Sequence, residues 1–295
     1  MPSLALRPDE APAAGVRRVA LDALDDAFAH LRGTSELDPD RQIHEARKRM
    51  KELRALAVLL RPTLGKAAAK EQGAAFRDTA KPLAGLRDAH VMRGVVGALA
   101  AQVPEASAEI FEAALGHHEE PDDPGEARAA ALATLEAVAP AVGTWGRDAP
   151  GWDGIGVGLE RLYAACRRDL AIVALGGSGE QFHDWRKAVK YLMFALRLLE
   201  PAWPELQQPY ERALDRLAEL LGDEHDLGVL IETLDATLAA HSGAPWHLAL
   251  RQAARARALA LRAEALALGS RIFAEQPRAF IRRQQRYWVV WTTST

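Results

Sequence analysis

The chain has 295 residues, of which 49% are hydrophobic and 26% charged, and this balance is typical of a folded protein and excludes a disordered one. The length suffices for one large domain or two ordinary ones. The single cysteine, Cys166, excludes an intramolecular disulfide framework and a cysteine-based zinc site. No run of about 18 apolar residues occurs, so we expect no membrane span. The first residues lack the features of a signal peptide, so we expect a cytoplasmic protein.

The net charge of −3 conceals a strong segregation of charge along the chain. Residues 41–61 hold seven Arg or Lys against two acids, and residues 251–286 hold nine Arg against two acids. Residues 105–126 hold eight acids and no Arg or Lys. The overall charge therefore says little about partners, whereas the local field of the basic segments favours an anion.

Alanine and leucine dominate and β-branched residues are sparse, which predicts helices throughout. The predicted helices, separated by turn residues, lie at roughly 15–32, 40–62, 66–102, 105–118, 125–142, 154–174, 180–200, 207–240, 245–268 and 270–286. Pro82 is expected to kink or split the helix predicted at 66–102. The Gly- and Pro-rich stretch 143–158 is a natural boundary between two halves.

The two halves repeat a pattern of residues. QIHEARKRMK at 42–51 matches QFHDWRKAVK at 181–190 in place, 139 positions later; we call these stretches the basic cassettes. An apolar run ending in proline follows each cassette, LRALAVLLRP at 53–62 and LMFALRLLEP at 192–201. Next comes a related element, LAGLRDAHVM at 83–92 and LGDEHDLGVL at 221–230. An internal repeat this long predicts two related helical bundles packed face to face.

Each basic cassette places its cations on one side of a helix. At about 100° per residue, the cations of each copy share one face, and in the first copy they fall within an arc of roughly 120°. Leu53, Leu56, Ala57 and Leu60 lie opposite in the first copy, and Leu192, Leu196 and Leu199 in the second. The basic faces consist of His44, Arg47, Lys48, Lys51 and Arg54 in the first copy and of His183, Arg186, Lys187, Lys190 and Arg197 in the second.

A solvated charged face is the ordinary explanation of such a stripe. Solvated faces usually mix both signs to gain pairs between residues four apart, and these stripes contain almost no acid. An anionic ligand that supplies the missing charge explains them better. The length of the stripe suits an extended polyanion, and the sparse aromatics, Tyr191 and Phe194 in the second copy only, favour a polymer without bases over nucleic acid.

With these cassettes, the apolar runs after them and the paired [RH]-D-x-x-V elements, the sequence resembles the CHAD family, the conserved histidine α-helical domain, over about residues 12–286. The resemblance implies an all-α fold of two four-helix bundles related by a pseudo-twofold axis, here 12–145 and 152–286, around a central basic cleft or pore. Residues 1–11 and 287–295 are expected to be tails. The resemblance also implies binding of inorganic polyphosphate without catalysis. We expect no cofactor and no metal.

The resemblance carries the basic faces of both cassettes over as polyphosphate-binding residues. Further arginines are expected from the first helix of each half and from the [RH]-D element. The second half has Met193 in the place of Arg54 and His225 in the place of Arg87, so the first half is expected to hold the anion more tightly. The additional candidates are Arg17, Arg18, Arg87, Arg161 and Arg167, with Arg168 as the alternative to Arg167.

Other sites and functions stay open. The cassette histidines have Arg and Lys at metal-ligand spacing, which repel a cation, and the residues 117–120, HHEE, are a better metal candidate by composition. Asp88 and Asp226 are read as partners that orient the basic faces and not as catalytic acids. The alternatives are an enzyme acting on phosphate polymers and a helical adaptor for nucleic acid or an acidic protein. Targeting to polyphosphate granules, storage and regulation of a partner are equally open roles.

Overall fold

The computed structural model describes residues 5–83, 85–100, 124–149, 151–237 and 245–294, and every regular element within these ranges is a helix. The prediction of an all-α fold is confirmed. The elements are α1 (Pro12–Leu31), α2 (Pro39–Leu59), α3 (Arg61–Leu64), α4 (Lys66–Ala80), α5 (Gly85–Ala100), α7 (Pro124–Val142), α8 (Asp153–Ala174), α9 (Gly179–Arg197), the 3-10 turn η1 (Glu200–Ala202), α10 (Pro204–Thr237), α11 (Pro245–Ile272) and α12 (Pro277–Thr293).

The two cassette helices begin at strong capping residues. Asp38 precedes α2 and its carboxylate accepts a hydrogen bond from the Arg41 amide at 3.0 Å. Ser178 precedes α9 and forms a capping box with Gln181, in which each side chain accepts from the other residue's backbone N–H. Each cap satisfies amides that the first turn leaves without partners, and this fixes where the cassette helix starts.

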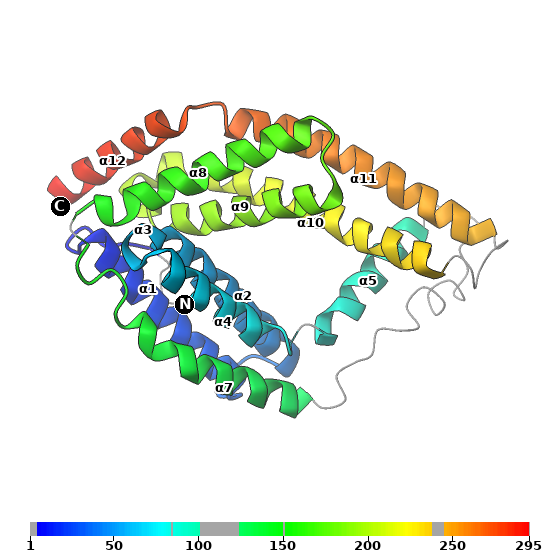
Figure 1. Ribbon diagram of the computed structural model, residues 1–295, viewed down its shortest axis with the longest axis horizontal. Coiled ribbons are helices and arrows are strands. Elements are labelled where there is room, and N and C mark those ends of the chain that lie inside the picture. Colours follow the sequence, from blue (N-terminus) through cyan, green and yellow to red (C-terminus); the bar gives the residue numbers. More distant parts are fainter. Residues whose placement is uncertain (1–4, 84, 101–123, 150, 238–244, 295) are drawn as a thin grey trace.

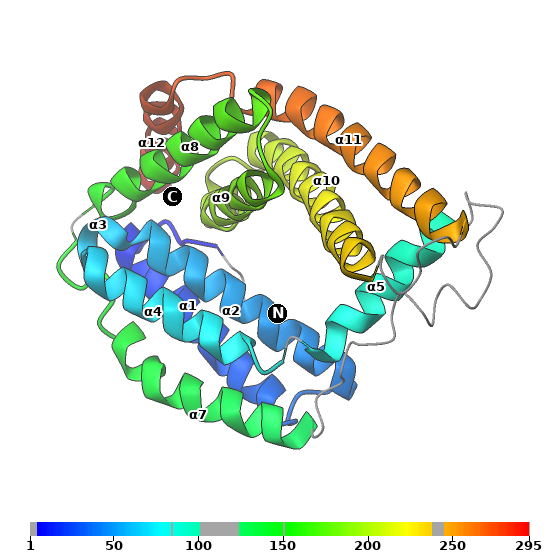
Figure 2. The same cartoon turned by 45° about the vertical axis from the view of Figure 1, so that its right-hand side comes forward.

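The helices pack in two groups of four. In the first group α1 packs on α2, α2 on α4, α4 on α7 and α7 on α1. In the second group α8 packs on α9, α9 on α10, α10 on α11 and α11 on α8. Figures 1 and 2 show the groups side by side, with α12 outside α8. The groups meet mainly where α2 packs against α9, and α8 also contacts α1, α2 and α3. The pseudo-twofold relation between the halves stays a prediction.

Helix α5 breaks the correspondence between the halves. Pro82 splits the predicted helix 66–102, since α4 ends at Ala80 and α5 begins at Gly85. The break lets α5 leave its own group, and it packs against α10 and α11 of the other group (Figure 2). The matching part of the second half lacks such a break and continues within the single long helix α10. The [RH]-D element of the first half therefore belongs spatially to the second group.

The C-terminal helices differ from the prediction in position. The predicted helix 270–286 is wrong, because α11 continues to Ile272 and α12 runs over Pro277–Thr293, starting at a proline in its first turn. The expected tail after 286 is thus helical as far as Thr293. The Tyr210 hydroxyl donates to the Ile272 carbonyl at 2.9 Å and holds the corner between the two helices. The predicted helix 105–118 lies outside the described residues.

The apolar faces of the cassette helices form part of one continuous core. Leu53, Leu56, Ala57 and Leu60 are buried, as are Leu192, Leu196 and Leu199, which confirms the predicted orientation of both helices. The largest fully buried side chains include Trp145, Trp185, Tyr163 and Phe76. No helix in the described ranges is long and apolar enough to cross a membrane.

The contact between the two groups tolerates no side chain at Gly158 of α8. A Cβ atom there would lie 1.9 Å from the carbonyl oxygen of Leu59, the last residue of α2. Since that atom belongs to the backbone, α8 and α2 would have to separate. We expect Gly158→Ala to lower the free energy of unfolding by roughly 1–3 kcal/mol, measured by urea denaturation.

Gly73→Ala in α4 is the matched control, because no atom lies within 4 Å of a Cβ built there. Alanine restricts the unfolded chain and suits a helix, so this variant should gain roughly 0.5–1 kcal/mol. Equal stabilities of the two variants would contradict the close approach of α8 to α2.

Candidate anion-binding site

The cations of the two cassettes meet where α2 packs against α9. The Arg54 guanidinium of α2 lies 6.0 Å from the ring centroid of Tyr191 in α9. This cation–π contact joins the first half of the chain to the second. Residues 137 positions apart in the sequence thereby become neighbours in one site.

One cavity at this contact, which we call the histidine cavity, has a volume of about 380 Å³. Helices α2, α4 and α9 supply its walls, with Tyr191 and Phe194 as the aromatic residues. No carboxylate occurs among the described residues that line it. Its basic residues are Lys51, Arg54, Arg77, His183, Arg186, Lys187 and Lys190.

A larger cavity of about 830 Å³, which we call the arginine cavity, adjoins the first. The two cavities share the lining residues Arg54, Lys187 and Tyr191, and we call the residues that line both cavities the basic track. The arginine cavity also contains two acids, and both have cationic partners: Asp169 lies 2.8 Å from Arg168 and Asp184 lies 2.5 Å from Lys187. Its cations are Arg54, Arg61, Arg161, Arg168 and Lys187.

The structure brings about half of the predicted binding residues into the basic track. Those that line it are Lys51, Arg54, Arg161, His183, Arg186, Lys187 and Lys190. The start of the first cassette lies outside both cavities: Lys48 pairs with Glu45 at 3.4 Å, and the Arg47 guanidinium donates to the Leu83 carbonyl at 2.7 Å. His44, four residues before Lys48, has its Nε2 atom 4.0 Å from the Glu45 carboxylate.

The remaining predicted arginines hold the fold together. Arg17 donates to the Trp145 carbonyl at 2.8 Å, and Arg18 forms a 2.6 Å ion pair with Glu10. These contacts occupy the guanidinium groups within their own bundle, away from the basic track.

Two arginines of the second half have similar roles. Arg167 donates to the backbone carbonyls of Phe273 and Glu275, at the corner between α11 and α12. Arg197 forms an ion pair with Glu211 of α10. Arg87 lies in α5, and its side chain falls outside the described part of the chain.

Two cations of the track were missed by sequence reasoning. Arg61 follows Arg54 by seven residues, close to two helical turns, so extending the first basic face into the apolar run would have found it. Arg77 lies in α4, outside any repeated motif, and only the packing of α4 on α2 brings it to the histidine cavity. No pattern in the sequence indicates that placement.

The rings of His183 and His225 are in contact beside the histidine cavity. Their ring centroids lie 4.5 Å apart with an angle of 32° between the planes. Burial first, and then the nearby His225, Lys187 and Arg186, together lower the pKa of His183 to about 4. Burial and Arg186 likewise lower the pKa of His225. Both imidazoles are therefore mainly neutral at pH 7 in the ligand-free protein.

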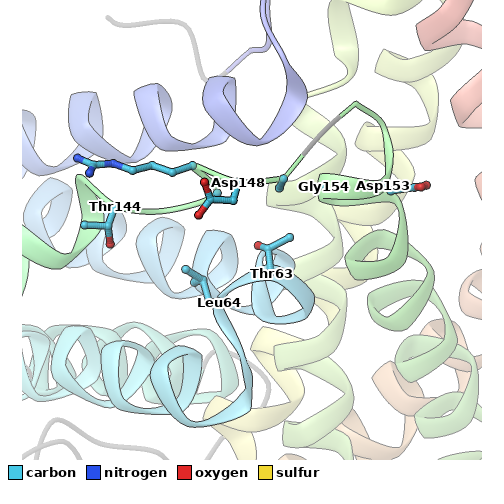
Figure 3. Close-up of a pocket in the computed structure, with 9 residues that line it drawn as sticks. Thr63, Leu64, Thr144, Asp148, Asp153 and Gly154 are labelled. Carbon is cyan, nitrogen blue, oxygen red and sulfur yellow. The ribbon is translucent and has the colours of Figure 1, made fainter.

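A third cavity lies away from the basic track, between α3 and the segment that joins α7 to α8 (Figure 3). It has a volume of about 320 Å³ and is lined by groups of both signs, including Arg147, Asp148 and Asp153. Thr63 and Thr144 complete its polar wall. Its mixed charge distinguishes it from the two basic cavities.

Metal-binding groups are not assembled in the described ranges. No cluster of three or more His, Cys, Asp or Glu residues within them is arranged to hold a metal ion. The HHEE candidate at 117–120 lies outside those ranges. Cys166 is buried, and burial raises the pKa of its thiol well above the ordinary value, so it is a packed, unreactive side chain.

The comparison with protein families gives one match. The model of the CHAD domain matches residues 18–235, which is more than half of the chain. The matched region begins in α1, ends in α10 and contains both basic cassettes. No curated protein and no solved structure matches the chain.

In the ligand-free protein, we expect the ring signals of His183 to titrate near pH 4, well below the ordinary histidine value of 6.5. The reason is burial beside cations that oppose a further positive charge. Two-dimensional NMR of the imidazole C–H groups measures this, with His183→Asn identifying the signal. A midpoint near 6.5 would show that the ring is open to water and lies apart from the cations.

Proposed function

The chain belongs to the CHAD domain family, and on this premise we propose that it binds inorganic polyphosphate along the basic track without catalysing its turnover. The observation that carries the proposal is the histidine cavity, whose described lining contains cations from three helices and no carboxylate. Clustered cations repel one another, and a polyanion replaces that repulsion with attraction.

The shape of the track supports a linear ligand. The histidine cavity and the arginine cavity are joined through Arg54, Tyr191 and Lys187, so one chain of phosphates could contact both without a break. A single phosphate would use only part of this surface. Binding should therefore strengthen with chain length, because each added phosphate contacts further cations and releases further counterions.

The aromatic residues of the track favour phosphate over nucleic acid. Single-stranded nucleic acids stack their bases on exposed aromatic rings. Here Arg54 lies over Tyr191, and Arg197 lies 5.5 Å from the ring centroid of Phe194, so cations already cover a face of each ring. This arrangement suits a ligand that has charges and no bases.

The acids near the track support binding without turnover. Metal-assisted phosphoryl chemistry needs carboxylates available to hold a divalent cation. Asp169 and Asp184 are instead ion-paired with Arg168 and Lys187. We extend the proposal to location: a module that binds polyphosphate without consuming it suits a cytoplasmic protein targeted to polyphosphate granules.

The double variant Arg54→Ala, Lys187→Ala removes the two cations that both cavities share. We expect it to weaken binding of long-chain polyphosphate by tenfold or more, and to reduce the slope of log K against log salt by roughly two, because two phosphate contacts are lost. Isothermal titration calorimetry at several salt concentrations measures both quantities.

Arg282→Ala, Arg286→Ala on α12 is the matched control, since it removes the same amount of charge from exposed positions outside the track. It should leave affinity and slope close to wild type. An equal loss in both double variants would mean that polyphosphate responds to total charge and not to the track. Tighter binding of single-stranded DNA at matched charge would favour the adaptor alternative.

Prolonged incubation of the protein with long-chain polyphosphate and Mg²⁺ or Mn²⁺ tests for turnover. We expect unchanged chain length on gels and no released phosphate, because the acids of the track are engaged by cations. If the wild-type protein shortened polyphosphate and Asp184→Asn did not, the result would contradict binding without catalysis and would favour the enzyme alternative.

A further inference from the structure

The ring contact between His183 and His225 joins the wall of the histidine cavity to α10. His183 lines the cavity from α9, whereas His225 is not among its described lining residues. The Nδ1 atom of His183 is buried and has no hydrogen-bond partner among the described residues. A buried ring nitrogen without a partner costs stability and needs an explanation. It is also a place where a proton could be gained.

Two of the described acids near this pair have cationic partners. Asp184 is ion-paired with Lys187, and Glu224 is ion-paired with Arg262 of α11 at 2.6 Å. Asp226 also lines a separate cavity, with Asp223 and Arg257. The lining residues that α5 contributes to that cavity are uncharged. The charged groups that act on the pair are Asp184, Arg186 and Lys187 of α9 and Glu224, Asp226 and Glu232 of α10. The cavity beside the pair adds Lys51 and Arg54 of α2, Arg77 of α4 and Lys190 of α9.

Resting on the proposed function, we propose that the His183–His225 pair takes up a proton when polyphosphate enters the histidine cavity, so that the protein binds its ligand more tightly as the pH falls. The pair would thus make the basic track sensitive to pH. The rings remain neutral while the cavity is empty, because burial disfavours the charged form and a further positive charge would be added beside Arg186 and Lys187. The bound polyanion offsets this by placing negative charge next to His183.

The direction of the effect follows from linkage. Polyphosphate raises the pKa of the pair, which starts from about 4 at His183 in the ligand-free protein. Between the free and the bound pKa the complex holds more protons than the free protein, so affinity rises as pH falls. One proton per complex gives at most about a tenfold change in affinity per pH unit. Well above the bound pKa the affinity should become independent of the pair.

Calorimetry in two buffers of different ionisation enthalpy, neither of them phosphate, measures the proton uptake directly. Long-chain polyphosphate is the probe, since its few terminal groups contribute little titration. At pH 6.5 we expect uptake of roughly one proton per complex and, from pH 8 to 6.5, a gain in affinity of several-fold to tenfold. His225→Asn, at a residue outside the described cavity lining, should lose most of the uptake while binding at pH 8 is retained. His183→Asn should also lose most of the uptake.

His30→Asn is the matched control, because burial also lowers the pKa of His30 but the residue lies in α1, outside the basic track. It should keep the wild-type uptake. Two outcomes overturn the inference and leave the proposed function intact. In the first, polyphosphate binds without proton uptake. In the second, the uptake persists in both His183→Asn and His225→Asn. No binding at either pH overturns both. If an asparagine variant fails to fold, the imidazole NMR signals of the wild-type complex decide the same question.

Discussion

Repulsion between cations at the contact of α2 with α9 is the constraint on which the rest of the structure depends. Two unit charges 4 Å apart repel by about 1 kcal/mol in water and by more near a protein surface. The same two helices offset this repulsion through their opposite faces, where Leu53, Leu56, Leu192 and Leu196 are buried in the core. The apolar packing holds the cations in place, and it leaves them a net positive field that an anion can neutralise.

Position on the helix decides what each basic residue does. In α2, Arg47 donates to the backbone of the turn before α5, and Arg49 is buried with Asp26 at 3.2 Å and Glu52 at 2.5 Å. Arg54 reaches the basic track. A charged segment therefore contains cations that hold the fold together beside cations that line a cavity.

Local signals in the sequence predicted most of the fold. Proline and glycine at the turns indicated where most helices begin and end. The spacing of apolar residues predicted the buried face of both cassette helices. The path of α5 was not predictable, because Pro82 indicates a break but not the direction in which the chain continues. The corner at 273–276 was missed since it depends on hydrogen bonds from Arg167 and Tyr210, which are distant in sequence.

The sequence predicted that the candidate site is basic, but it predicted only some of the residues that line it. The repeated cassettes indicated a shared anion-binding surface, and the structure places Lys51 and Lys190 in one cavity. Periodicity alone cannot tell that the Arg17 guanidinium reaches the Trp145 carbonyl or that Arg77 reaches the cavity, because both depend on packing between distant segments. The pairing of His183 with His225 also joins two helices and leaves no trace in the cassette pattern.

The proposed function requires that α2 and α9 contribute to one anion track. Mass spectrometry of lysine acetylation, with and without saturating polyphosphate, tests this requirement most directly. We expect polyphosphate to protect Lys51 of α2 together with Lys187 and Lys190 of α9, while the exposed Lys66 and Lys70 of α4 react as before. Protection confined to one of the two helices, or equal protection of all five lysines, would contradict it.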